Sequence, residues 1–186
     1  MKAKVCALAV AVLIAWALKQ HYAEARANDL WWILAPTAKL VGIITGVPFT
    51  LEPAEGYLSR ERLFLIEKSC AGINFMIAAF AMLVLTLLHR VSAGLAAARV
   101  LAVSLVASYL AAVATNAARI AIAMWLAGHP AGLTNFGAAD IHRIEGVTVY
   151  FSALVLLYDF AQRLDCRSCA VRGNVGAGAR RAEAAS

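Results

Sequence analysis

The chain has 186 residues, of which 62% are apolar and only 15% are charged, and its formal net charge at pH 7 is +6. Its mean hydropathy is +0.74, and its apolar share lies well above the roughly 45 to 50% of soluble domains. This composition excludes a soluble domain and indicates an integral membrane protein. The length allows one domain of several membrane spans, without a separate soluble catalytic domain.

The first apolar stretch covers residues 5–18 and follows two lysines, which is also the pattern of a signal-peptide core. A weak cleavage signal, Ala23-Glu24-Ala25, lies downstream, but the apolar run extends to Tyr22. An uncleaved first transmembrane helix over residues 1–22 is therefore favoured over a cleaved signal peptide.

Residues 23–69 are predicted to form an external segment. Its apolar part contains Lys39 between two prolines; a lysine at mid-depth in a membrane costs about 2.5 to 3.5 kcal/mol, and prolines remove backbone donors. We therefore expect an interfacial or re-entrant helix over residues 36–46, with Trp31 and Trp32 as interface anchors.

Three further stretches are apolar enough to span. Residues 71–88 form a span of ordinary length, and residues 146–160 form a short last span. Residues 93–128 would measure about 54 Å as one helix, against a hydrocarbon core of about 30 Å, so this helix must tilt, bend or break. The predicted fold is an all-α, polytopic membrane bundle of about four spanning helices plus one interfacial or re-entrant helix.

An even number of spans places both termini on one side of the membrane. That side carries nine lysines and arginines, against six in the opposite loops. Positive residues favour the cytoplasmic side, so both termini are predicted to be cytoplasmic. The tail, residues 162–186, is basic and of low complexity, and we expect it to be disordered.

Cys70 is the leading nucleophile candidate among the four cysteines. It directly precedes the span 71–88, where the positive end of the helix dipole would favour its thiolate near the water interface. Its alternative role is that of a small packing residue at a helix end. The pair Cys166 and Cys169 forms a lone C-x-x-C without further ligands, so we expect no metal site and no cofactor.

Arg119 lies in an otherwise apolar run of the long span. An arginine inside a membrane indicates a functional site, unless its side chain snorkels to the interface. Asn116 stands three residues earlier and shares a helix face with Arg119. The predicted topology places both on the same side of the membrane as Cys70.

His142 lies in the loop before the last span, on that same side. An imidazole titrates near neutral pH, so His142 can act as a general acid or base, although a lone loop histidine is more often merely solvated. His129, which precedes Pro130 in a predicted turn, is the competing candidate.

These motifs resemble one family. Cys-Ala-Gly at 70–72, Asn-x-x-Arg-Ile at 116–120 and His-x-x-x-Gly at 142–146, in this order and on one membrane face, are similar to those of the exosortase/archaeosortase family. The context of Cys70 is most similar to exosortase K. The resemblance covers roughly residues 30–160. The chain departs from the family at Ala71, where many members have serine, and lacks several N-terminal spans of the larger exosortases.

The resemblance implies a cysteine peptidase or transpeptidase of the cytoplasmic (inner) membrane, with a catalytic core over residues 70–161 and an active site on the external, periplasmic face. It would cleave the C-terminal sorting signals of exported proteins, of the PEP-CTERM kind: a short motif, a transmembrane helix and a basic tail. The acyl group would pass to water or to another acceptor, and we expect no nucleic-acid partner. Carried over by motif, the site comprises Cys70 as nucleophile, Arg119 for the oxyanion or substrate position, His142 as acid/base, and Asn116, Gly72 and Gly146 as supporting residues.

Two other functions fit the same residues. A small membrane binding or transport protein would hold an anionic ligand with Asn116 and Arg119 and use Cys70 only structurally. A helical assembly subunit would instead pack on a partner through the small residues of the alanine-rich stretch 93–114.

Overall fold

The computed structural model of the protein describes residues 2–88, 94–127 and 144–163. Within these residues, four helices are long and apolar enough to cross a membrane, and the protein is a multi-pass membrane protein with an all-α bundle, as the sequence predicts. The four candidate spans are α1 (Lys2–Glu24), Lys68–Leu88, which comprises the 3₁₀ turn η2 (Lys68–Ala71) and α3 (Ile73–Leu88), α4 (Gly94–Ala127), and the last helix, Ile144–Arg163.

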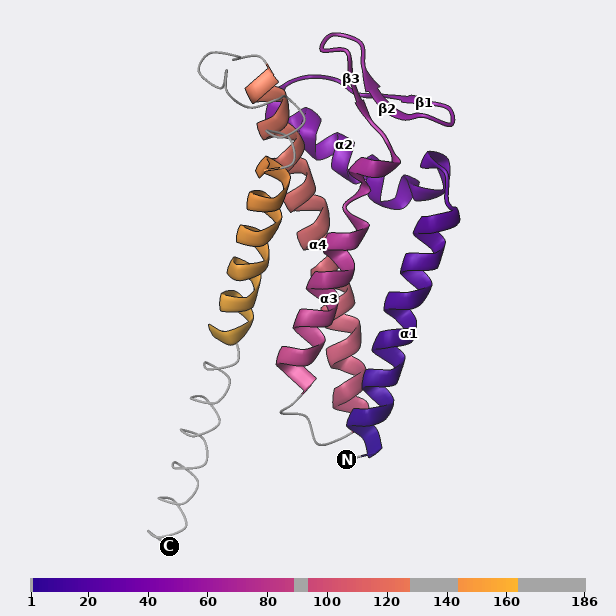
Figure 1. The fold of residues 1–186 in the computed structure, drawn as a ribbon, viewed down its shortest axis with the longest axis vertical. Helices are drawn as coiled ribbons and strands as arrows, with labels where there is room; N and C mark the ends of the chain where they lie inside the picture. Colours follow the sequence, from indigo (N-terminus) through magenta and orange to yellow (C-terminus); the bar gives the residue numbers. More distant parts are fainter. Residues whose placement is uncertain (1, 89–93, 128–143, 164–186) are drawn as a thin grey trace, which may run out of the picture.

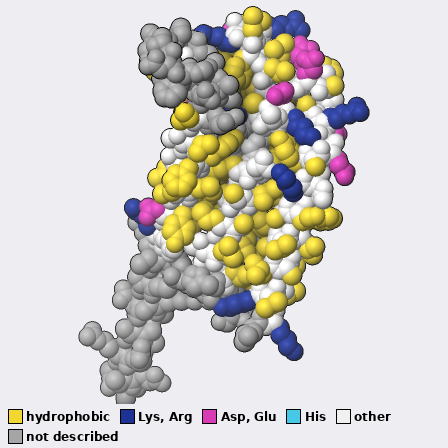
Figure 2. Space-filling model, in the orientation of Figure 1, with side chains coloured by type: hydrophobic (Ala, Val, Ile, Leu, Met, Phe, Trp, Pro, Cys, Tyr) yellow, Lys and Arg dark blue, Asp and Glu magenta, His cyan; other side chains and the backbone are white. Residues whose placement is uncertain are grey.

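The segment Lys68–Leu88 is the centre of the bundle. Of its apolar window 56% is buried, against 11% for α1 and 6% for the last helix. α3 packs against both α1 and α4, and its buried side chains include Phe80 and Val84. The outer helices therefore expose broad apolar surfaces, visible in Figure 2, which in a membrane contact lipid.

The long helix α4 is unbroken over its 34 residues. At about 1.5 Å per residue it measures about 51 Å, well beyond the hydrocarbon thickness of about 30 Å. From its sequence this helix is expected to tilt, bend or break, and the structure shows that it does not break. The start of α1 and the end of the last helix lie at the same end of the bundle (Figure 1), as four antiparallel crossings require.

The helix α2 (Trp31–Thr45) follows the 3₁₀ turn η1 (Ala27–Leu30) and lies across the other end of the bundle (Figure 1). It begins five residues before the predicted interfacial helix 36–46. Pro36 lies inside it and cannot donate a hydrogen bond to the carbonyl of Trp32. The hydroxyl of Tyr109 on α4 donates to that carbonyl instead, at 2.7 Å, so the proline is accommodated and α2 is fastened to α4.

A small antiparallel sheet, which the sequence did not predict, lies beyond α2 (Figure 1). Its strand order is β1-β2-β3, with the bounds Thr50–Glu52 (β1), Gly56–Ser59 (β2) and Phe64–Ile66 (β3). Gly56 has φ +132°, and a Cβ there would lie 2.2 Å from the carbonyl oxygen of Ile66, so only glycine fits. β3 leads directly into the η2 turn and thereby connects the sheet to Cys70.

Candidate functional site

Cys70 lies in the η2 turn that joins the sheet to α3. Its backbone N–H donates to the carbonyl of Glu67 at 2.9 Å, and its side chain is half-buried. α3 itself begins only at Ile73, after Gly72 in a left-handed conformation. The sequence places Cys70 directly before the span 71–88; the structure shows in addition that Cys70 lies in a separate 3₁₀ turn, which Gly72 separates from α3.

Asn116 on α4 connects this turn to the rest of the bundle. Its side chain is fully buried, and its Nδ2 donates to the backbone carbonyl of Cys70. Its Oδ1 accepts hydrogen bonds from the Tyr150 hydroxyl at 2.8 Å and from Arg119 Nε at 3.4 Å. With donors on one side and an acceptor on the other, the orientation of the amide is determined by its partners.

Gly72 permits this contact for two reasons. Its φ is +68°, a conformation that side chains rarely adopt. A Cβ at this position would also lie 3.3 Å from Cγ of Asn116, closer than most real contacts. The η2 turn and α4 can therefore approach this closely only with glycine here.

Arg119 is almost fully buried, with 7% of its surface exposed. Its guanidinium carbon lies 5.6 Å from the centre of the Tyr150 ring, a distance at which a cation is attracted to an aromatic face. The same ring stacks on Phe75 of α3, with centroids 5.2 Å apart. The Tyr150 ring therefore lies between Arg119 of α4 and Phe75 of α3.

Polar groups also lie on the outer side of the turn. The Ser69 hydroxyl donates to Glu67 Oε1 at 2.6 Å and lies 3.8 Å from Sγ of Cys70. On the side of α1, Lys19 Nζ donates to Asn74 Oδ1 at 2.8 Å, and Lys68 Nζ donates to the carbonyl of Ala23 at 3.1 Å. The η2 turn therefore contacts the buried Asn116 through the Cys70 carbonyl and carries exposed polar side chains beside the thiol.

The structure brings together most of the residues singled out in the sequence. Cys70, Gly72, Asn116 and Arg119 meet as described, and Gly146 adjoins them, since a Cβ there would lie 3.7 Å from Cδ of Arg119. The other predicted groups lie outside the described residues: His142, its competitor His129, the pair Cys166 and Cys169, and the tail beyond residue 163. In the parts of the chain that the structure describes, no three His, Cys, Asp or Glu side chains gather into a possible metal site.

Tyr150 is the main residue that the sequence analysis missed. It lies four residues after Gly146, and residues at this spacing share a face of a helix. The helix face that carries Gly146 of the His-x-x-x-Gly motif therefore also carries Tyr150, whose hydroxyl donates to Asn116. A polar aromatic residue one turn after a motif glycine was the available signal.

Comparisons with models of known protein families, with curated proteins and with solved structures find no match. The resemblance to the exosortase/archaeosortase family therefore rests on the three motifs.

Proposed function

We propose that the protein is a membrane-embedded cysteine peptidase or transpeptidase of the exosortase type. The observation that carries the proposal is the direct link between the two described motifs: the amide of Asn116 binds the carbonyl of Cys70 and also accepts from Arg119. The half-buried thiol of Cys70 would supply the nucleophile. The buried Arg119, held beside this turn, would supply a cation for the negative charge that develops on the substrate.

The reaction would start with attack of the Cys70 thiolate on the scissile carbonyl carbon, which forms a C–S bond and a tetrahedral oxyanion. The guanidinium of Arg119 would stabilise this oxyanion, more strongly than in water because Arg119 is buried. The C–N bond then breaks, and the leaving amine takes a proton from His142. A thioester remains on Cys70.

Water or an amine acceptor completes the cycle. His142 accepts a proton from the attacking group, the acceptor adds to the thioester carbonyl, and the C–S bond breaks. Cys70 is regenerated, and the product is a free carboxylate or a new amide. Hydrolysis and transfer thus share every residue and differ only in the acceptor.

Asn116 and Tyr150 act as positioning residues in this mechanism. The Asn116 amide holds the backbone of the nucleophile, and the Tyr150 hydroxyl fixes the direction of that amide. Because both ends of the amide already bind protein groups, Asn116 is poorly suited to hold a ligand. This disfavours the binding or transport function, which uses Asn116 as a ligand group.

The proposed substrates are exported proteins that end in a short motif, an apolar helix and a basic tail. Such a helix would lie in the bilayer beside the bundle and present its external end at the level of Cys70. The proposed orientation has both termini in the cytoplasm and the site on the external face of the inner membrane. The excess of basic residues on the side of the termini supports it.

The direct test is cleavage of a matched substrate, encoded in the same genome and ending in such a tail, in cells that express the full chain. Cys70→Ala should abolish processing. The matched control is Cys6→Ala, because Cys6 is an exposed free cysteine on α1, far from the η2 turn in the sequence. Unchanged processing with Cys70→Ala would refute the proposal. A Cys70→Ser variant with almost no effect on the function of the protein, together with a defective Arg119→Ala variant, would favour the binding or transport function.

A further inference from the structure

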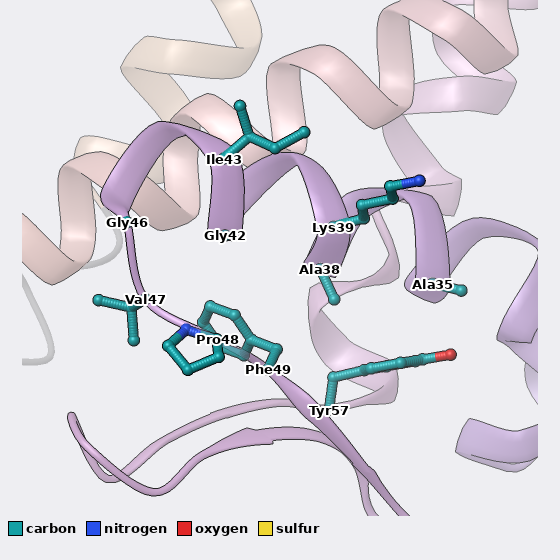
Figure 3. Close-up of a pocket in the computed structure, with 10 residues that line it drawn as sticks. All are labelled: Ala35, Ala38, Lys39, Gly42, Ile43, Gly46, Val47, Pro48, Phe49 and Tyr57. Atoms are coloured by element: carbon teal, nitrogen blue, oxygen red, sulfur yellow. The ribbon is translucent and has the colours of Figure 1, made fainter.

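A groove lies between α2 and the sheet, on the outside of the bundle. Its volume is about 480 Å³, large enough for part of a lipid-sized molecule. Figure 3 shows small residues of α2 facing the rings of Phe49 and Tyr57 across the groove. The floor and walls are thus mostly apolar.

Among the described residues, one charged side chain borders this groove, and it is a cation. Lys39 is exposed and is the sole charged residue of α2. In the described parts of the chain, no acidic side chain lines the groove beside it. Among the residues that the structure describes, it forms no hydrogen bond or ion pair. The groove therefore has the chemistry of a site for a molecule with an apolar part and an anionic group.

The position of α2 points to the bilayer as the source of that molecule. With 15 residues, α2 is about 22 Å long, too short to span a core of about 30 Å. It lies across the end of the spanning helices (Figure 1), and its outward face exposes Trp31 and Ile43, which are 66% and 71% exposed. An exposed tryptophan is a common anchor at the membrane interface, where a lysine can extend its ammonium group among the headgroups.

We propose that this groove is a binding site for an anionic glycerophospholipid. Its phosphate pairs with Lys39, and the upper part of one acyl chain lies against Ala35 and Gly42, between α2 and the rings of Phe49 and Tyr57. A lysine near a membrane surface attracts anionic lipid by an amount that corresponds to about a fivefold preference. The site does not depend on the proposed peptidase reaction.

Native mass spectrometry of the full chain in detergent micelles tests this proposal. The probes are phosphatidylglycerol and phosphatidylcholine with identical acyl chains, offered in equal amounts to delipidated protein. The wild type should retain phosphatidylglycerol about fivefold more than phosphatidylcholine. Lys39→Gln should abolish this preference, and Lys39→Arg should keep it.

Two further variants separate the charge from the groove. Arg62→Ala is the matched control, because Arg62 is an exposed cation between β2 and β3, outside the groove, and the preference should persist. Ala35→Leu fills the floor of the groove from within a helix, so retention of both lipids should fall several-fold while the preference remains. Circular dichroism and gel filtration identify any variant that does not fold.

Four results would overturn the proposal. Lys39→Gln could retain the preference, or Arg62→Ala could remove it as fully as Lys39→Gln does. Unchanged retention in Ala35→Leu would show that the acyl chain does not lie in the groove. A retained peptide in place of phospholipid adducts would assign the groove to a different occupant.

Discussion

Replacing Asn116 by alanine perturbs the site at the point where three elements meet. The change removes the donor to the Cys70 carbonyl and the acceptor of Tyr150 and Arg119. Hydrogen bonds between membrane helices contribute about 0.6 kcal/mol on average and at most about 1.7 kcal/mol, and a buried group left unpaired costs about 1 to 3 kcal/mol. We therefore expect Asn116→Ala to lower the free energy of unfolding by about 2 to 4 kcal/mol.

Unfolding of the full chain in mixed micelles with increasing sodium dodecyl sulfate, followed by circular dichroism, measures this change. Ser108→Ala is the matched control, because Ser108 is also fully buried on α4 but makes one local hydrogen bond, to the carbonyl of Leu105 at 2.9 Å. Its loss should cost less than about 1 kcal/mol. The account of Asn116 as the link between the helices is wrong if the two variants lose the same stability.

Two further predictions concern the groups on either side of Asn116. Gly72→Ala should cost at least about 1 to 2 kcal/mol in the same unfolding assay, because its left-handed backbone disfavours a side chain and its Cβ would press on the amide. Gly94→Ala, at a helical position with open space around it, should be neutral or slightly stabilising, and an equal loss in both variants would contradict the explanation. Tyr150→Phe should keep the ring contacts but lower kcat for substrate cleavage about fivefold to tenfold with KM unchanged, since one positioning hydrogen bond is worth about 1 kcal/mol. Tyr158 is an exposed tyrosine on the same helix, and the control variant Tyr158→Phe should have normal kinetics. If Tyr150→Phe has a normal kcat while Cys70→Ala is inactive, Tyr150 has no part in the mechanism, but the proposed reaction stands.

The membrane bundle could be predicted because its signals are local. A membrane span can be recognised in a sequence as a run of apolar residues whose length matches the thickness of the bilayer. All four candidate spans lie within a few residues of their predicted bounds. The prediction for α2 was less accurate at its start. The predicted helix starts at Pro36, whereas α2 starts at Trp31. The Tyr109 hydroxyl satisfies the carbonyl that the proline leaves free inside the helix.

The sheet could not be predicted because its strands carry little sequence signal. They are three or four residues long, too short for alternating polarity to stand out. Leu63 adopts a positive φ, which the residue type does not suggest. The pairing of Gly56 with the β3 backbone depends on a close approach that appears only in three dimensions.

The site was predictable to the extent that its residues carry unusual chemistry for their surroundings. Arg119 and Asn116 stand out as polar residues in an apolar span, and Cys70 stands out at the start of one. Tyr150 did not stand out, because a tyrosine in the outer half of a span is ordinary as an interface residue. Its role depends on the contact of the last helix with α4, which no local pattern encodes.

The central claim is that Cys70 forms a covalent acyl intermediate. Wild-type protein mixed with a matched substrate, quenched in acid at early times and digested, can be analysed by mass spectrometry for the peptide that contains Cys70. The account predicts a thioester to the N-terminal product of cleavage on this cysteine, which neutral hydroxylamine releases and which is absent in Cys70→Ala. Substrate cleavage that proceeds equally in Cys70→Ala, with no adduct on Cys70 in the wild type, would contradict it.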